Sequence, residues 1–251
     1  ASPCSWHTSV DSSAQNSGAG SPLSRLCSTH SVATSSCTVL ISRATRPFTA
    51  TAPSAPVLAR VPPAVAPALK SADDALRAHA ATALAAVLRF GGAPAAATFA
   101  AESPLLPPGA VKTPFVRRAR AQMLGVLAES APDVVRAIAG AALAALREDM
   151  ACAPATALRH TAFWAFGRVA GIDGLAAPDE CHALLAAALK DNNVDICLAA
   201  MKALRHIMKT NTTLVAPHAE AFRAALEARN AAAPQHVKLA IASTLPYVRN
   251  I

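Results

Sequence analysis

The sequence predicts an all-α protein, and three observations support this prediction. An apolar pattern recurs five times at intervals of 38 to 43 residues, with anchors at Leu76, Phe115, Leu158, Ile196 and Val237. Apolar or small residues follow most anchors at four, seven, eight and eleven positions, which form one side of an α-helix. The composition is 53% apolar but only 4% aromatic, and alanine, the strongest helix former, supplies much of it.

Residues 1–56 differ in composition from the rest of the chain. They contain 21 Ser or Thr residues, three arginines and a single acidic residue, Asp11, and they lack apolar periodicity. Such a segment cannot bury enough apolar surface to fold, so we expect it to be disordered. A Ser-rich, Arg-bearing, acid-poor leader is typical of an organellar transit peptide, with a plastid slightly favoured over a mitochondrion. The alternative is a disordered tail without an address, on a cytoplasmic protein.

Residues 57–251 are predicted to form helices in pairs, and the second helix of each pair carries the apolar pattern. Ser71 and Asp74 predict an N-terminal box for the first patterned helix, and Gly91-Gly92 end it. A proline stands near the start of each helix that precedes a patterned one, where a missing N–H costs least. These preceding helices are predicted over residues 94–102, 132–148, 178–190 and 216–229.

A helix pair of this size cannot enclose a core by itself. Each pair of about forty residues must therefore stack on its neighbours, and only the stack has a continuous interior. The sequence thus predicts an α-solenoid of about five stacked helix pairs over residues 57–251, preceded by the disordered leader.

The patterned helices resemble the second helices of HEAT repeats, in the HEAT/armadillo superfamily. The resemblance rests mainly on two segments, which are Asp73 with Leu76-Arg77, Ala80 and Ala83-Leu84, and Asp191–Ile196 with Ala200 and Ala203-Leu204. Near Phe115, the pair Val116-Arg117 fits the family pattern only if the register shifts by one residue. The resemblance covers about residues 70–251 and implies a HEAT-like fold. It implies little about function, because the superfamily contains scaffolds, transport receptors, inhibitors and a few enzymes.

Basic residues are concentrated in the patterned helices, which hold thirteen Lys or Arg against four acidic residues, whereas the preceding helices hold five against eight. In HEAT-like arrays the second helices line the concave surface, so the resemblance implies a basic concave face. Such a face concentrates acidic ligands. The candidate partner-binding residues are Arg117, Arg118, Arg120, Arg159, Lys202, Arg205, Lys209 and Lys238. The alternative is that these side chains only solvate apolar helices.

We therefore predict a non-enzymatic scaffold or adaptor that binds a protein partner with an acidic surface, or assembles into a larger complex. A nucleic-acid-binding scaffold, with RNA as its ligand, is the first alternative, although single-strand binders use more aromatic rings than this chain has. A lyase-type HEAT enzyme is the second. Trp164, in the one aromatic cluster, is expected either to pack between helices or to contact a ligand.

The sequence predicts neither a metal site nor a cofactor. The scattered histidines do not stand with cysteine or carboxylate at metal-ligand spacing, and no phosphate-binding loop or nucleophile motif is present. Six cysteines without a CxxC pair predict free thiols in a reduced compartment. The longest apolar stretches are shorter than the roughly 20 residues that cross a bilayer, so we expect no membrane insertion.

Overall fold

The computed structural model describes Val65 and residues 67–251, and every regular element in this part of the chain is a helix. The chain divides into two units, Ala1–Ser36 and Cys37–Ile251, and all described residues belong to the second. The all-α prediction is confirmed for the described residues. The leader expected over residues 1–56 lies outside them.

The described helices follow the predicted pairs closely. Their bounds are α3 Asp74–Glu102, α4 Pro114–Ser130, α5 Pro132–Arg136, α6 Ala139–Met150, α7 Thr156–Ala170, α8 Pro178–Leu189, α9 Val194–Thr210, α10 Thr212–Val215, the 3-10 turn η2 Ala216–His218, α11 Ala219–Ala232 and α12 Gln235–Arg249. The helix predicted over 132–148 is divided into α5 and α6 at Ile138, whose backbone leaves the helical region.

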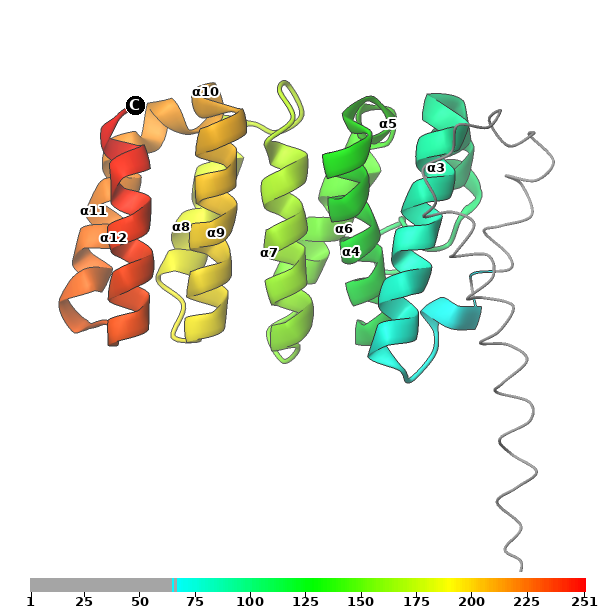
Figure 1. Cartoon of the computed structure of the whole chain (residues 1–251), viewed down its shortest axis with the longest axis horizontal. Coiled ribbons are helices and arrows are strands. Elements are labelled where there is room, and N and C mark those ends of the chain that lie inside the picture. The colour runs from blue at the N-terminus through cyan, green and yellow to red at the C-terminus, as the bar shows by residue number, and fades with distance from the viewer. Residues whose placement is uncertain (1–64, 66) are drawn as a thin grey trace, which may run out of the picture. The chain divides into compact units, whose positions relative to one another are not determined.

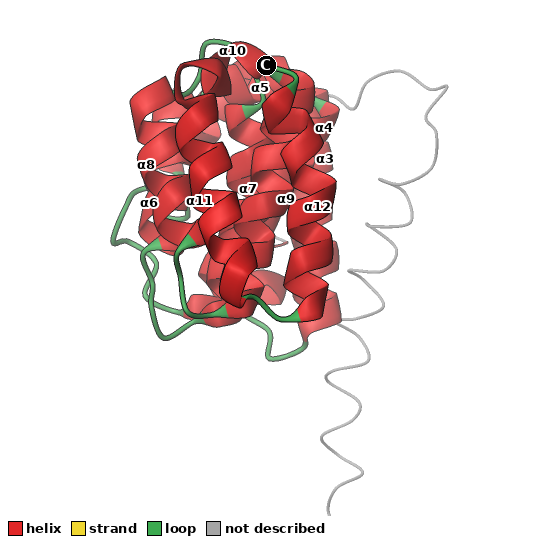
Figure 2. Cartoon of the chain, turned by 90° about the vertical axis from the view of Figure 1, so that its left-hand side faces the viewer, coloured by secondary structure: helices red, strands yellow, loops and turns green. Residues whose placement is uncertain are grey.

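The longer helices of the described residues form two layers. In Figure 1, α3, α4, α7, α9 and α12 lie side by side in one row, and each contacts its neighbours in that order. Helices α6, α8 and α11 lie behind this row, against α7, α9 and α12 respectively. Figure 2, turned by 90°, shows the same two layers from one end of the row. The patterned helices thus share one layer.

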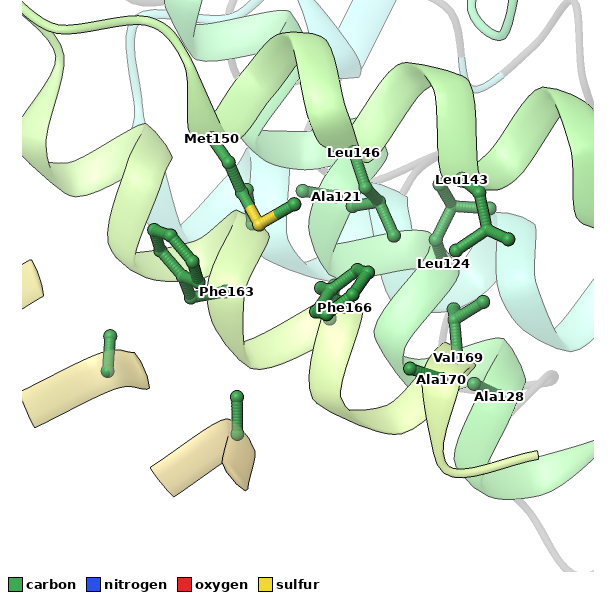
Figure 3. Packing of buried hydrophobic residues seen from close by; sticks show 14 of the residues in the cluster. Ala121, Leu124, Ala128, Leu143, Leu146, Met150, Phe163, Phe166, Val169 and Ala170 are labelled. Atoms are coloured by element: carbon green, nitrogen blue, oxygen red, sulfur yellow. The ribbon is translucent and has the colours of Figure 1, made fainter. Parts of the chain in front are cut away.

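The apolar pattern forms the interior side of these helices. Buried residues occupy every pattern position of α7 and α9, which are Leu158, Ala162, Ala165, Phe166 and Val169, and Ile196, Ala200, Ala203, Leu204 and Ile207. In α12, Val237, Ile241, Thr244 and Val248 are buried. Figure 3 shows Phe166 and Val169 of α7 among Leu124 of α4 and Leu146 of α6. The period read from the sequence therefore identifies the core side of these helices correctly.

The anchor predicted for α4 is wrong by one residue. Phe115 is 56% exposed, whereas Val116 is buried. Counting four, seven, eight and eleven from Val116 gives Arg120, Met123, Leu124 and Leu127, all of which are buried. The shift moves Arg120 to a position that alanine occupies in α3, α7 and α9. A guanidinium in that position requires a buried partner.

Two features at the ends of α3 refine the prediction. Asp73, rather than the pair Ser71 and Asp74, is the N-cap, because its side chain accepts hydrogen bonds from the N–H groups of Ala75 and Leu76. Gly92 has a positive φ of 67° and breaks the helical path, so residues before and after it are two helical stretches joined at a kink.

Helix α3 is also the one described helix that is long and apolar enough to cross a membrane. This result reflects length and composition only, and 39% of its most apolar window is buried inside the protein. The buried residues pack against α4 and α5, and the Gly92 kink interrupts the span. The absence of membrane insertion remains a prediction.

Candidate partner-binding surface

Two of the predicted binding residues, Arg117 and Arg120, form a buried charge cluster with Asp149. Arg117 Nε donates to Asp149 Oδ1 at 2.7 Å, and Arg120 Nη2 donates to the same oxygen at 2.5 Å. Arg120 Nε adds a longer bond to Oδ2 at 3.3 Å. The side chains of Arg120 and Asp149 are fully buried, and Arg117 is nearly so. The three residues hold α4 against α6.

The same cluster and the neighbouring Glu148 form hydrogen bonds with the loop between α3 and α4. Arg120 Nη1 donates to the Leu105 carbonyl oxygen at 2.9 Å, and the Gly109 N–H donates to Glu148 Oε2 at 3.0 Å. Burial acts to raise the pKa of Glu148, but the Gly109 N–H and the nearby Arg117 lower that pKa below its ordinary value. Burial raises the pKa of Asp149, and the attraction of Arg120 and Arg117 opposes that rise.

The burial of Arg117 and Arg120 corrects the prediction for both residues. A partner protein cannot reach side chains that are inside the molecule and already bonded to a carboxylate. Their role is to join two helices and a loop, so they do not belong to the candidate surface.

Arg118 and Arg159 are partly exposed, and each is paired with a carboxylate of a neighbouring segment. Arg118 Nη1 lies 3.3 Å from Asp74 Oδ2, and Arg159 Nη2 lies 2.5 Å from Asp191 Oδ2. A hydrogen bond from the Asn193 N–H lowers the pKa of Asp191, and Arg159 lowers it further. Each of these two arginines therefore has a carboxylate beside it within the fold, and Asp74 is shared between Arg118 and Arg77.

Three predicted residues on α9 keep their charge available, and we call them the α9 basic surface. Lys202 and Lys209 are exposed and Arg205 is partly exposed. Their spacing of three and four residues places them along the side of α9 opposite its buried stripe. None of the three has a carboxylate within ion-pair distance among the described residues. Asp195, two turns before Lys202, is the acidic residue on this side of α9.

Lys238 of α12 lies apart from the α9 basic surface. Arg205 Nη1 donates to Ser243 Oγ at 2.9 Å, so Ser243 is on the side of α12 that faces α9. Five residues separate Lys238 from Ser243, which places Lys238 about 140° around the helix. The structure therefore groups the three α9 residues but does not bring Lys238 to them.

Two histidines border the α9 basic surface on the side of α7. Burial lowers the pKa of His160, and Lys202 lowers it further, against the opposing charge of Asp195. Burial lowers the pKa of His206 as well, and Arg168 adds to that effect. Both rings therefore stay neutral to a lower pH than ordinary histidine, in the positive field of the cations beside them.

Replacing Lys202 with glutamine is expected to raise the pKa of His160, because one of the charges that disfavour the imidazolium disappears. The titration of the ring protons, followed by NMR between pH 4 and 9, measures this shift directly. Lys112→Gln, an exposed change on the α3–α4 connection, is the control and should leave the titration of His160 unchanged. An unchanged His160 in the Lys202 variant would mean that Lys202 does not lie beside it in solution.

Trp164 packs between helices, which was the first of the two roles predicted for it. A Cβ added to Gly125 of α4 would lie 2.0 Å from the Trp164 ring, so the absence of a side chain at Gly125 makes room for the ring. The guanidinium of Arg168 lies over the ring at 4.6 Å from its centroid and is paired with Glu129. The indole thus contributes to the contact between α4 and α7.

Two of the three described cysteines, Cys181 and Cys197, are buried, and Cys152 is partly exposed. Burial raises the pKa of Cys181 to about 12, and burial also raises that of Cys197, so both thiols are protonated at neutral pH. The rings of His182 and His218 stack at 4.3 Å between centroids. Within residues 67–251 no group of three His, Cys, Asp or Glu side chains is placed to hold a metal ion.

Comparison with known proteins adds no functional residue. A scan against protein-family models gave no match, and a search of curated proteins gave none either. The candidate surface therefore rests on the geometry and charge of α9 and its neighbours.

Proposed function

We propose that this protein is a non-enzymatic helical-repeat scaffold that binds an acidic segment of a partner protein through the α9 basic surface. The observation that carries this proposal is that the cations of some patterned helices have carboxylate partners, whereas those of α9 do not among the described residues. The arginines on α4 and α7 that were candidates have carboxylate partners within the fold. Lys202, Arg205 and Lys209 have no carboxylate partner in the part of the chain that the structure describes, so their charge is free to act on a ligand.

The proposed architecture is a HEAT-like α-solenoid. It is supported by polar contacts between helices that are about one repeat apart in sequence. Arg118 bonds Asp74 across 44 residues, Arg168 pairs with Glu129 across 39, and Arg205 bonds Ser243 across 38. Contacts between neighbouring helices at this sequence spacing are those that stacked repeats require.

The test measures binding of fluorescent poly-glutamate to the full chain by anisotropy, at low and at high salt. The variant Lys202→Glu/Arg205→Glu/Lys209→Glu is expected to bind about tenfold more weakly or worse, since three exposed contacts of up to about 1 kcal/mol each become repulsive. The matched control is Arg89→Glu/Lys112→Glu/Lys190→Glu, which changes the net charge equally at three exposed cations elsewhere. It should bind nearly as the parent does.

Equal weakening by both triple variants would reduce the interaction to net charge and would overturn the proposed surface. Binding that does not change between about 50 and 500 mM salt would also contradict an electrostatic site. Single-stranded RNA is measured in parallel. Tighter and more salt-dependent binding of RNA than of poly-glutamate would replace the protein partner with the nucleic-acid alternative.

A further inference from the structure

Helices α9 and α12 meet in a fixed register that extends the α9 basic surface onto a second helix. Arg205 bonds Ser243, and one turn later Lys209 Nζ lies 5.1 Å from the centre of the Tyr247 ring. Both contacts join residues 38 positions apart. Leu239 is one turn before Ser243 and lies on the same stripe of α12, so this register places it beside the turn of α9 that carries Lys202.

We call this surface the α9–α12 seam. It is cationic along the edge on α9 and apolar along the edge on α12. Its residues are Lys202, Arg205 and Lys209 of α9 and Leu239, Ser243 and Tyr247 of α12. Leu239 is 63% exposed and has the most exposed large apolar side chain in the described part of the chain. Tyr247 is 37% exposed. An exposed leucine alone would need no explanation. The seam is amphipathic because Leu239 lies near the exposed Tyr247 ring and near three cations that have no carboxylate partner among residues 67–251.

The spacing of the cations matches a helical ligand better than an extended one. Along α9 they follow one another at three and four residues, or about 4.5 and 6 Å. A ligand helix alongside α9 has the same rise, so carboxylates at positions i, i+3 and i+7 reach all three cations. An extended strand presents side chains on one face about every 6.6 Å, so its carboxylates do not match the spacing of the three cations.

We propose that the α9–α12 seam binds an amphipathic acidic α-helix, with its carboxylates toward α9 and its apolar side on Leu239 and Tyr247. This inference rests on the proposed function and names the form of the partner. Charge complementarity selects that partner. The chain's own residues 1–56 contain one acidic residue and three arginines, so they do not supply the required charge pattern.

The experiment compares two labelled peptides of about five helical turns with identical composition of Glu, Leu, Ala and Gln. In the ordered peptide, glutamates and leucines occupy adjacent stripes of the helix, and in the scrambled peptide they are spread around it. The full chain at about 50 mM salt is expected to bind the ordered peptide about tenfold more tightly. The variant Leu239→Gln/Tyr247→Gln should remove this preference without weakening the scrambled peptide. Ile251→Gln, at another exposed apolar residue, is the control and should retain it.

Each outcome separates the inference from the proposed function. Equal affinity for both peptides overturns the amphipathic helix but leaves an acidic partner in place. No binding of either peptide overturns both. If sedimentation shows that the parent self-associates and that Leu239→Gln/Tyr247→Gln abolishes it, the seam binds a second copy of the chain and the inference fails. Circular dichroism of each variant establishes that the helices are intact.

Discussion

Replacing Asp149 with alanine is expected to lower the free energy of unfolding by about 3–5 kcal/mol, the usual cost of removing one partner from a buried ion pair. The variant leaves Arg120 fully buried and Arg117 nearly so, without their closest carboxylate and with only the Glu148 carboxylate at 3.5 Å from each guanidinium group. For a protein of this size the loss corresponds to a fall of roughly 6–20 °C in Tm. Urea unfolding monitored by circular dichroism measures the change in free energy.

Two further variants test whether the effect comes from buried charge. Asp133→Ala removes the carboxylate from an exposed pair with Arg136 and should leave stability unchanged. The combined variant Arg117→Met/Arg120→Met/Asp149→Leu replaces all three charges with apolar side chains and should be more stable than Asp149→Ala. If Asp149→Ala and Asp133→Ala behaved alike, the cluster would not hold α4 to α6.

The core side of the patterned helices was predictable because it depends on local periodicity. Leu158, Ile196 and Val237 anchor stripes that are buried as expected, since an amphipathic helix presents one side to the interior whatever its neighbours are. The positions of Pro132 and Pro178 also marked the first turns of α5 and α8. These features require only the geometry of a single helix.

The error in α4 arose where the local pattern was ambiguous. Phe115 is apolar and fits the spacing, while the correct register places Arg120 on the interior side. A sequence-based reading assigns arginine to the surface. Its partner, Asp149, lies 29 residues away on another helix, so the pairing becomes visible only when α4 and α6 are packed together. The acidic pair Glu148-Asp149 beside an arginine-rich unit was the one available hint.

The candidate surface was predictable in composition but not in extent. Eight of the thirteen basic residues of the patterned helices were predicted to bind a partner, because a sequence does not reveal which cations already have carboxylate partners. The structure pairs Arg118 with Asp74 and Arg159 with Asp191, and it separates Lys238 from α9. The remaining candidate site is smaller and lies on one helix, so the geometry of that helix sets the spacing of its residues. It consists of Lys202, Arg205 and Lys209.

The position of the α9 basic surface depends on the close approach of α7 and α9, which Gly167 permits. A Cβ added at Gly167 would lie 2.7 Å from Ala203 Cα and 2.9 Å from Ala203 Cβ. Backbone of a packed helix cannot turn aside as a flexible side chain can, so α9 must shift. This contact is therefore sensitive to a single methyl group.

Gly167→Ala is expected to destabilise the protein by about 1–3 kcal/mol through overpacking, although alanine favours a helix over glycine by about 1 kcal/mol. The matched control is Gly140→Ala on α6, where an added Cβ meets no atom within 4 Å, so only the propensity gain should act and stability should hold or rise. The urea midpoints of the two variants must move in opposite directions, or the midpoint of Gly140→Ala must stay level while that of Gly167→Ala falls.

Removing the opposing methyl in Gly167→Ala/Ala203→Gly should recover part of the lost stability. Because α9 carries Lys202, Arg205 and Lys209 on its opposite side, Gly167→Ala should also weaken poly-glutamate binding, whereas Gly140→Ala should not.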